Sequence, residues 1–138
     1  MKLFVDTSAL IAVLDADLER HSDVLAAWDR AIEEQRDLVT SNYVLVECCA
    51  LVQRRLGLEA LGALTGVFVP LMHTLWVDEG LHATALSALV TTGRRELSLV
   101  DCTSFELMRR HGIRHAMALD DDFARQGFEL SPALRPSR

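Results

Sequence analysis

Short apolar runs and longer amphipathic stretches alternate along the chain, and this pattern predicts strands that alternate with helices. Strand-like runs lie at 3–5, 38–40, 73–77 and 115–119, and a shorter run at 128–130 is the candidate for a further strand. Helices are predicted from residue 7 onward and over 24–32, 41–56, 58–68, 78–90 and 98–112. Such alternation is typical of a three-layer α/β/α domain with a central, mainly parallel sheet, here of four to five strands.

Length and composition indicate one globular domain. The chain has 138 residues, half of them hydrophobic and a quarter charged, which excludes a disordered protein. We expect a single domain over 1–131 and a loose C-terminal tail over 132–138. The net charge of −6 gives no bulk attraction to nucleic acid, although a local basic patch can coexist with an acidic site.

The chain carries no pattern typical of export or of membrane insertion. Lys2 precedes an apolar stretch, but Asp6 interrupts that stretch and no small-residue cleavage pattern follows. The longest uncharged stretch, 60–77, contains Pro70 and His73 and is predicted to be a helix, a break and a strand. Three cysteines without a CxxC motif exclude a disulfide framework or a zinc knuckle: Cys48, Cys49 and Cys102. We therefore expect a cytoplasmic protein.

Four acids occupy positions where a carboxylate is unexpected. Asp6 and Asp120 each follow a predicted strand, and ligands of parallel sheets bind beyond the carboxyl ends of the strands. Glu47 and Asp101 lie within the apolar stretches YVLVECCALV and LSLVDCTSFELM. A buried carboxylate is costly unless positive charge meets it, so the four acids together predict a shared cation.

Each acid also has a structural explanation when it is taken alone. Asp6 could cap the helix that follows it, and Asp101 could close a capping box with Ser98. Negative charge at 120–122 is favourable at a helix N-terminus. Glu47 could pair with an arginine farther down its helix, Arg54 or Arg55.

A site made of carboxylates, without histidine or cysteine, suits hard cations. Mg²⁺ and Mn²⁺ take oxygen ligands, and Mg²⁺ keeps several waters, which leaves room for a substrate phosphate. A cation held in this way can activate water and stabilise the charge that develops in phosphodiester displacement.

Four segments resemble the acidic motifs of PIN-domain nucleases, in order and over essentially the whole chain: FVDTSALIAVL, the helix from Asn42 to Glu47, SLVDCTSFELM and ALDDDFARQGF. The resemblance is greatest to the VapC toxins of bacterial toxin–antitoxin pairs. It implies a PIN-like fold and a ribonuclease dependent on Mg²⁺ or Mn²⁺. It further implies an RNA substrate, a homodimer and a cognate antitoxin protein as partner.

The resemblance also assigns the residues of the site. Asp6, Glu47 and Asp101 match the first three acids as catalytic and metal-binding residues, and Asp120 matches the fourth because Phe123 fixes the register. Asp121 or Asp122 could share the role of Asp120. Polar residues at positions that often support the acids, or that serve as helix caps, are Thr7, Ser8, Asn42, Thr103, Ser104 and Asp122.

Two other functions compete with the ribonuclease. A metal-dependent phosphatase or phosphotransferase with an aspartyl nucleophile would want an acid two positions after Asp6, where this chain has Ser8. A PIN domain with inactive acids could bind RNA or protein without cleaving.

Some features outside the acids also yield expectations. Trp28 and Trp76 lie in apolar patterns and are predicted to be core residues. The mainly apolar helix at 58–68 could form a dimer face, but internal packing is the preferred interpretation. Arginine pairs at 54–55, 94–95 and 109–110 could contact phosphates.

Overall fold

The computed structural model describes residues 1–133 and shows a sheet whose strand pairings are all parallel. The five strands run in the order β3-β2-β1-β4-β5, which places β1 at the centre. Their bounds are β1 Lys2–Val5, β2 Asp37–Ser41, β3 His73–Leu75, β4 His115–Met117 and β5 Glu129–Leu130. The predicted parallel sheet is confirmed, and 128–130 does contain its fifth strand. Most of the predicted tail, from 134 on, lies outside the described residues.

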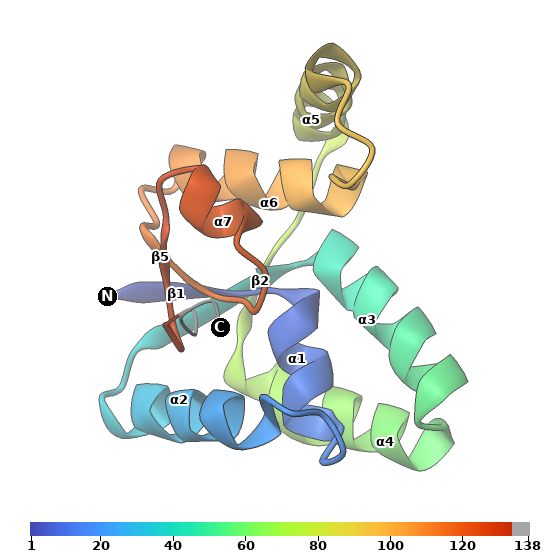
Figure 1. Ribbon diagram of the computed structural model, residues 1–138, viewed down its shortest axis with the longest axis vertical. Coiled ribbons are helices and arrows are strands. Elements are labelled where there is room, and N and C mark those ends of the chain that lie inside the picture. The colour runs from blue at the N-terminus through green and yellow to red at the C-terminus, as the bar shows by residue number, and fades with distance from the viewer. Residues whose placement is uncertain (134–138) are drawn as a thin grey trace.

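Helices cover both faces of this sheet, so the predicted α/β/α layering is also confirmed (Figure 1). In Figure 1, α1 and α2 lie on one side of the strands and α6 and α7 on the other. Helix α5 packs on α6 and stands beyond it, away from the sheet. The longer helices are α1 Thr7–Leu14, α2 His21–Glu33, α3 Asn42–Arg55, α5 Glu79–Thr92 and α6 Leu99–Arg110, and the short ones are α4 Leu58–Ala63 and α7 Asp122–Arg125.

Four helices begin at a side chain that accepts a hydrogen bond from the first turn. The capping residues are Asp6, Ser41, Asp78 and Ser98. Asp6 and Ser41 stand where β1 and β2 pass directly into α1 and α3. These tight strand-to-helix turns bring the starts of α1 and α3 to the same edge of the sheet, because β1 and β2 are parallel neighbours.

The core lies between the sheet and its helices and contains the side chains of β1, Leu3, Phe4 and Val5, with no exposed surface. Trp28 is buried against Phe68, with ring centroids 5.2 Å apart, as predicted. The prediction for Trp76 was wrong, because its side chain is 76% exposed. Trp76 follows β3, an edge strand, at a point where no further strand lies beyond it.

The uncharged segment after α4 differs from the predicted single helix closed by Pro70. A π-helical turn, Leu64–Phe68, follows α4, and a 3₁₀ turn, Val69–Leu71, contains the proline. Leu64 is buried and Leu61 and Phe68 pack against the core, which confirms internal packing on one side of this segment, whereas Leu58 and Val67 are exposed. Within residues 1–133, no helix is both long enough and apolar enough to pass through a membrane.

Candidate acidic site

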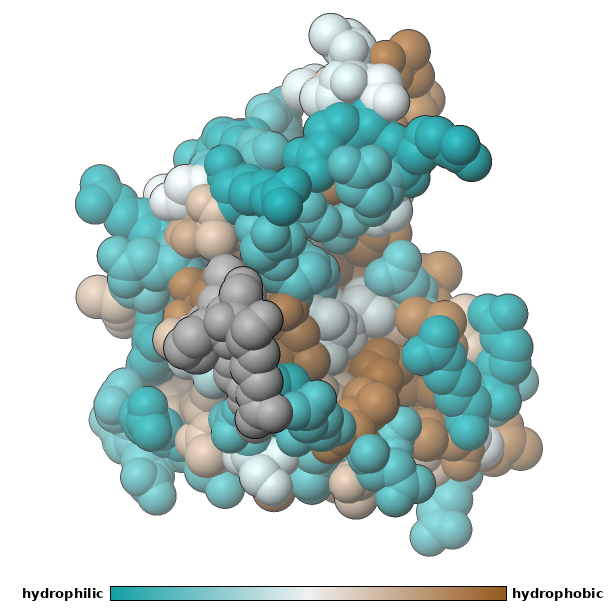
Figure 2. Space-filling view, viewed as in Figure 1, coloured by the Kyte–Doolittle hydropathy of each residue, from teal (hydrophilic) through white to brown (hydrophobic). Residues whose placement is uncertain are grey.

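One cleft of about 390 Å³ is lined by all four of the predicted acids. It opens at the carboxyl edge of the sheet, and the surface in Figure 2 is hollowed between the part that carries α5 and α6 and the part that carries α3. Asp6 precedes α1, Glu47 lies on α3, Asp101 lies on α6 and Asp120 follows β4. The other lining residues are Thr7, Ser8, Ile11, Leu18, Leu51, Arg55, Ser98 and Leu119.

Asp6 is the most enclosed of the acids, with 4% of its surface exposed. Its Oδ2 accepts hydrogen bonds from the backbone N–H of Ser8 at 3.3 Å and from the Ser8 hydroxyl at 2.7 Å. The Ser8 oxygen in turn accepts from the N–H of Leu119 at 3.1 Å. Asp6 therefore does cap α1, and it also faces the cleft. Ser8 joins it to the end of the β4 segment.

Burial and neighbouring negative charge act together on this site. Burial raises the pKa of Asp6 to about 7, the Ser8 hydrogen bond opposes that shift, and the charges of Asp120 and Asp101 add to it. Burial also raises the pKa of Asp120, with further contributions from Asp101 and Asp122. Asp6, Asp101 and Asp120 are therefore close enough to repel one another, and Asp6 alone of the three is buried.

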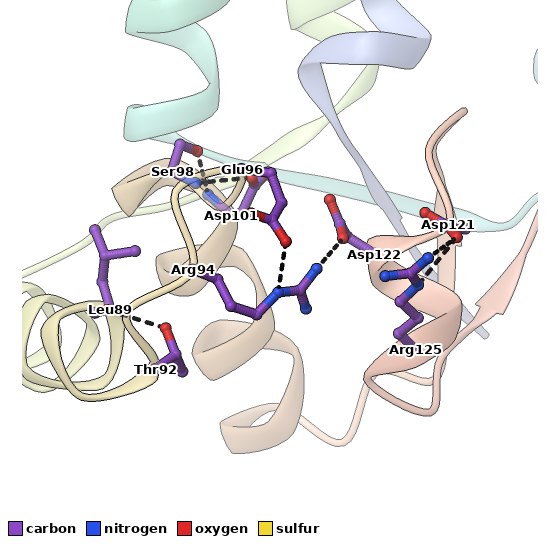
Figure 3. A network of polar contacts seen from close by, with 9 residues as sticks. All are labelled: Leu89, Thr92, Arg94, Glu96, Ser98, Asp101, Asp121, Asp122 and Arg125. Atoms are coloured by element: carbon purple, nitrogen blue, oxygen red, sulfur yellow. Dashed lines mark hydrogen bonds and ion pairs between the residues drawn. The ribbon is translucent and has the colours of Figure 1, made fainter.

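Asp101 both caps the start of α6 and lines the cleft, the two roles that its sequence left open. Its Oδ2 accepts from the N–H of Ser98 at 3.0 Å, and its own N–H donates to the Ser98 hydroxyl at 3.0 Å, which completes a capping box (Figure 3). The same side chain lines the cleft. Capping occupies one carboxylate oxygen and leaves Oδ1 without a hydrogen bond to any residue in 1–133.

The carboxylate oxygens that line the cleft are suited to bind a cation. Asp6 and Asp101 each keep Oδ1, and Asp120 keeps Oδ2, without a hydrogen bond in the described part of the chain. None of the four acids forms an ion pair with a residue in 1–133, so Glu47 does not pair there with Arg54 or Arg55. Such uncompensated oxygens match the preference of Mg²⁺ and Mn²⁺.

The spacing of the acids is looser than that of a closed metal cage. No group of three or more His, Cys, Asp or Glu side chains in residues 1–133 is arranged to hold a metal ion as it stands. The loose spacing of the acids leaves room for a hydrated Mg²⁺, which binds through one or two carboxylates and keeps several waters.

The predicted auxiliary residues divide into two groups. Thr7 and Ser8 line the cleft, and the Thr7 hydroxyl is buried without a hydrogen-bond partner among the described residues. The hydroxyls of Thr103 and Ser104 both donate to the carbonyl of Val100 at 2.8 Å, away from the cleft lining. Asn42 accepts from the N–H of Val77 at 2.7 Å, and Asp122 pairs with Arg94.

Nothing in the sequence indicated that some other residues lie at or near the cleft. Arg55 lines the cleft, whereas its sequence showed only one member of a basic pair. Leu18 comes from the connection after α1 and closes the wall beside it. Tyr43 hydrogen-bonds His82 across α3 and α5 next to Glu47, a contact between residues far apart in sequence.

A parallel α/β/α sheet with carboxylates at its C-terminal edge defines the class of protein, and the comparison with protein families agrees with it. The PIN domain model matches residues 3–129, and the chain belongs to that family.

The relatives include an enzyme that the chain matches over nearly its whole length. The 23S rRNA-specific endonuclease VapC20 of Mycobacterium tuberculosis is 36% identical over 132 residues, which cover 94% of this chain and 98% of VapC20. The crystal structure of VapC20, described as a sarcin–ricin loop cleaving toxin, superposes with a TM-score of 0.82 and covers 91% of this chain and 95% of its own.

More distant structures share the fold alone. VapBC2 from Rickettsia felis, solved with a DNA fragment from its promoter, gives a TM-score of 0.70 at 11% identity, covering 94% of this chain and 97% of the other. FitAcB from Neisseria gonorrhoeae gives 0.68 at 20% identity, covering 93% and 95%.

Proposed function

We propose that this PIN domain is an endoribonuclease dependent on Mg²⁺ or Mn²⁺, and the toxin of a toxin–antitoxin pair. The observation that carries the proposal is the convergence of Asp6, Glu47, Asp101 and Asp120 on one cleft. These acids come from distant parts of the sequence, and none has an ion pair in residues 1–133. A bound cation would offset their negative charge.

Asp6, Asp101 and Asp120 would hold the cation, and Glu47 would contribute from the α3 wall. When bound, the cation would stabilise the charge that develops at the phosphodiester and would lower the pKa of a water, which becomes the nucleophile once it has lost its proton. Ser8 keeps the Asp6 carboxylate fixed, because its hydroxyl donates to Oδ2 while its oxygen accepts from the backbone of Leu119. Without a cation, Asp6 binds and releases its proton near neutral pH.

Arg55 would bind the substrate backbone. It lines the cleft beside Leu51 on α3 and has no ion-pair partner within residues 1–133. A free guanidinium can contact a phosphate, and such a contact offsets the repulsion between RNA and an acidic cleft. The similarity to VapC20 supports RNA as the substrate and makes 23S rRNA the first RNA to test.

The proposal is tested by RNA cleavage in Mg²⁺ or Mn²⁺, with EDTA as the metal-free control. Substitutions expected to lower cleavage by roughly 100-fold or more, by analogy with the loss of other electrostatic catalytic groups, are Asp6→Asn, Glu47→Gln, Asp101→Asn and Asp120→Asn. Asp17→Asn and Glu59→Gln, which lie outside the cleft, should leave cleavage unchanged. Wild-type cleavage by Asp6→Asn would show that the site is wrong.

The same assay separates the competing functions. Hydrolysis of a simple phosphomonoester by the wild type, lost in Asp6→Asn, would favour the phosphatase. RNA binding without cleavage in either metal would favour a PIN domain with inactive acids. The phosphatase lacks support, because Ser8 follows Asp6 where a second acid would be needed and its hydroxyl is engaged with Asp6.

An antitoxin partner belongs to the same proposal. The fold is shared with the toxin–antitoxin assemblies VapBC2 and FitAcB, although at identities too low to carry a partner across. We expect growth arrest when the chain is expressed alone and rescue when its cognate antitoxin is co-expressed. Unimpeded growth with soluble, folded protein would contradict the toxin assignment and leave the nuclease assignment standing.

A further inference from the structure

The connection between α5 and α6 reaches across to Asp122 at the start of α7 (Figure 3). Arg94 lies in this connection. Its Nε donates to Oε1 of Glu96 at 2.9 Å, and its Nη2 lies 3.4 Å from Oδ1 of Asp122, the first residue of α7. The Arg94 side chain is 31% exposed and that of Asp122 is 16% exposed, so the second pair is largely shielded from water. Such shielding makes an ion pair less sensitive to screening.

Asp122 connects this arginine to the acidic cleft. Its backbone N–H donates to Oδ1 of Asp120 at 3.2 Å. Its carboxylate is also one of the negative charges that raise the pKa of Asp120. The guanidinium of Arg94 therefore holds the residue that orients Asp120 and offsets a charge that repels it.

We propose that Arg94 is a positioning residue for the acidic site, which fastens the first turn of α7 so that the Asp120 carboxylate stays turned toward Asp6 and Asp101. This inference rests on the proposed function, because positioning matters only if Asp120 acts. It also distinguishes two neighbouring arginines, Arg94 and Arg95, that looked equivalent in the sequence. Arg94 is engaged by two carboxylates, whereas Arg95 is exposed and has no ion pair within residues 1–133.

The first measurement is cleavage by Arg94→Gln, which keeps most of the side-chain volume and removes the charge. Partners that orient metal-binding groups typically contribute 10–100-fold to metal affinity or activity, and we expect about a tenfold loss here. Arg95→Gln and Arg125→Gln are the matched controls. Each removes one positive charge nearby, and Arg125 pairs with Asp121 instead of Asp122. Equal losses in all three variants would overturn the inference in favour of bulk charge.

A double-mutant cycle tests whether Arg94 acts through Asp122. Asp122→Asn keeps the backbone N–H that reaches Asp120 and removes the carboxylate charge, and with it the ion pair to Arg94. If the two residues act as one unit, the double variant Arg94→Gln/Asp122→Asn should cleave RNA as fast as the less active of the two single variants. Losses that multiply would overturn the inference and assign Arg94 a direct contact with RNA. Arg94→Lys should rescue only partly, since an ammonium lacks the fork that reaches both acceptors.

A second readout does not depend on cleavage. The Asp122 amide proton of the metal-free protein should exchange with water several-fold faster in Arg94→Gln than in the wild type or in Arg95→Gln, because Asp122 is no longer held against its acceptor on Asp120. Unchanged exchange would overturn the inference even if cleavage fell. If the wild type cleaves no RNA, the proposed function fails, and the exchange rates still report whether Arg94 holds this turn.

Discussion

At the scale of single residues, Asp6 shows how one side chain can serve both folding and chemistry. Its carboxylate caps α1 through Ser8, and its burial between the start of α1 and the end of β4 raises the pKa. The sequence could indicate a cap or a site, and the structure shows that capping uses Oδ2 and leaves Oδ1 without a hydrogen bond in residues 1–133.

The raised pKa makes the metal-free protein less stable as pH increases. Between the ordinary value of 3.8 and about 7, the unfolded Asp6 has lost its proton while the folded one retains it, so stability falls across this window. Asp6→Asn removes this dependence and keeps the cap, because Asn is an equally good N-cap. In EDTA the variant should be more stable than the wild type by about 1–4 kcal/mol at pH 8 and nearly equal at pH 4. Urea unfolding at both pH values measures the difference, and a variant less stable at pH 8 would contradict the prediction.

At the scale of elements, most boundaries could be predicted because capping side chains mark them in the sequence. Asp6, Ser41, Asp78 and Ser98 each begin a helix near the predicted position. Periodicity could not show which side of an apolar segment meets the core. Trp76 was therefore misplaced, since an apolar residue at the end of an edge strand has the same local pattern as one in a central strand.

The convergence of the four acids could be predicted from the sequence, but the positions of the arginines could not. Asp6 and Asp120 follow strands that became neighbours of one sheet, so their meeting follows from the topology. Glu47 and Asp101 were noticed because acids are rare in apolar helical stretches. Arg55 and Arg94 carry no such contrast, since a basic residue near a helix end is ordinary, and only the packing of distant elements distinguishes them.

The start of α6 allows its two roles to be separated by experiment. Ser98→Ala removes half of the capping box and should cost about 1 kcal/mol of stability. Asp101→Asn keeps an oxygen that can accept from the Ser98 N–H, so its cost should be smaller. Mn²⁺ should raise the melting temperature of the wild type and of Ser98→Ala, because it binds the folded site alone. The shift should nearly vanish in Asp101→Asn. A full shift in that variant would mean that Asp101 only caps the helix.

At the scale of the whole molecule, exposed apolar side chains gather on α5 and its neighbours. Leu86 and Val90 lie on α5, Val46 lies on α3 and Trp76 precedes α5, and all four are exposed. Exposed apolar side chains on neighbouring elements can form an association site. This arrangement supports the homodimer that the VapC resemblance implied, which remains a prediction.

We expect the wild type to sediment as a dimer at micromolar concentration and Val90→Glu to shift it toward monomer, because a charge would be buried at the interface. Val90 is 74% exposed in the single chain, so the substitution should not disturb folding. Val67→Glu, at an exposed apolar position on the π-helical turn after α4, is the control and should stay dimeric. A monomeric wild type would refute the dimer.

The position of β1 between β2 and β4 has a consequence for the protein during its synthesis. Ser8 and Leu119, which are joined by a hydrogen bond, lie 111 residues apart in the sequence. A nascent chain that has not yet released β4 from the ribosome therefore leaves β1 as an open edge strand, and Asp6 lacks Asp101 and Asp120 beside it. The four acids can meet only after the ribosome has released the segment that carries Asp120, so the proposed catalytic cleft cannot exist before then.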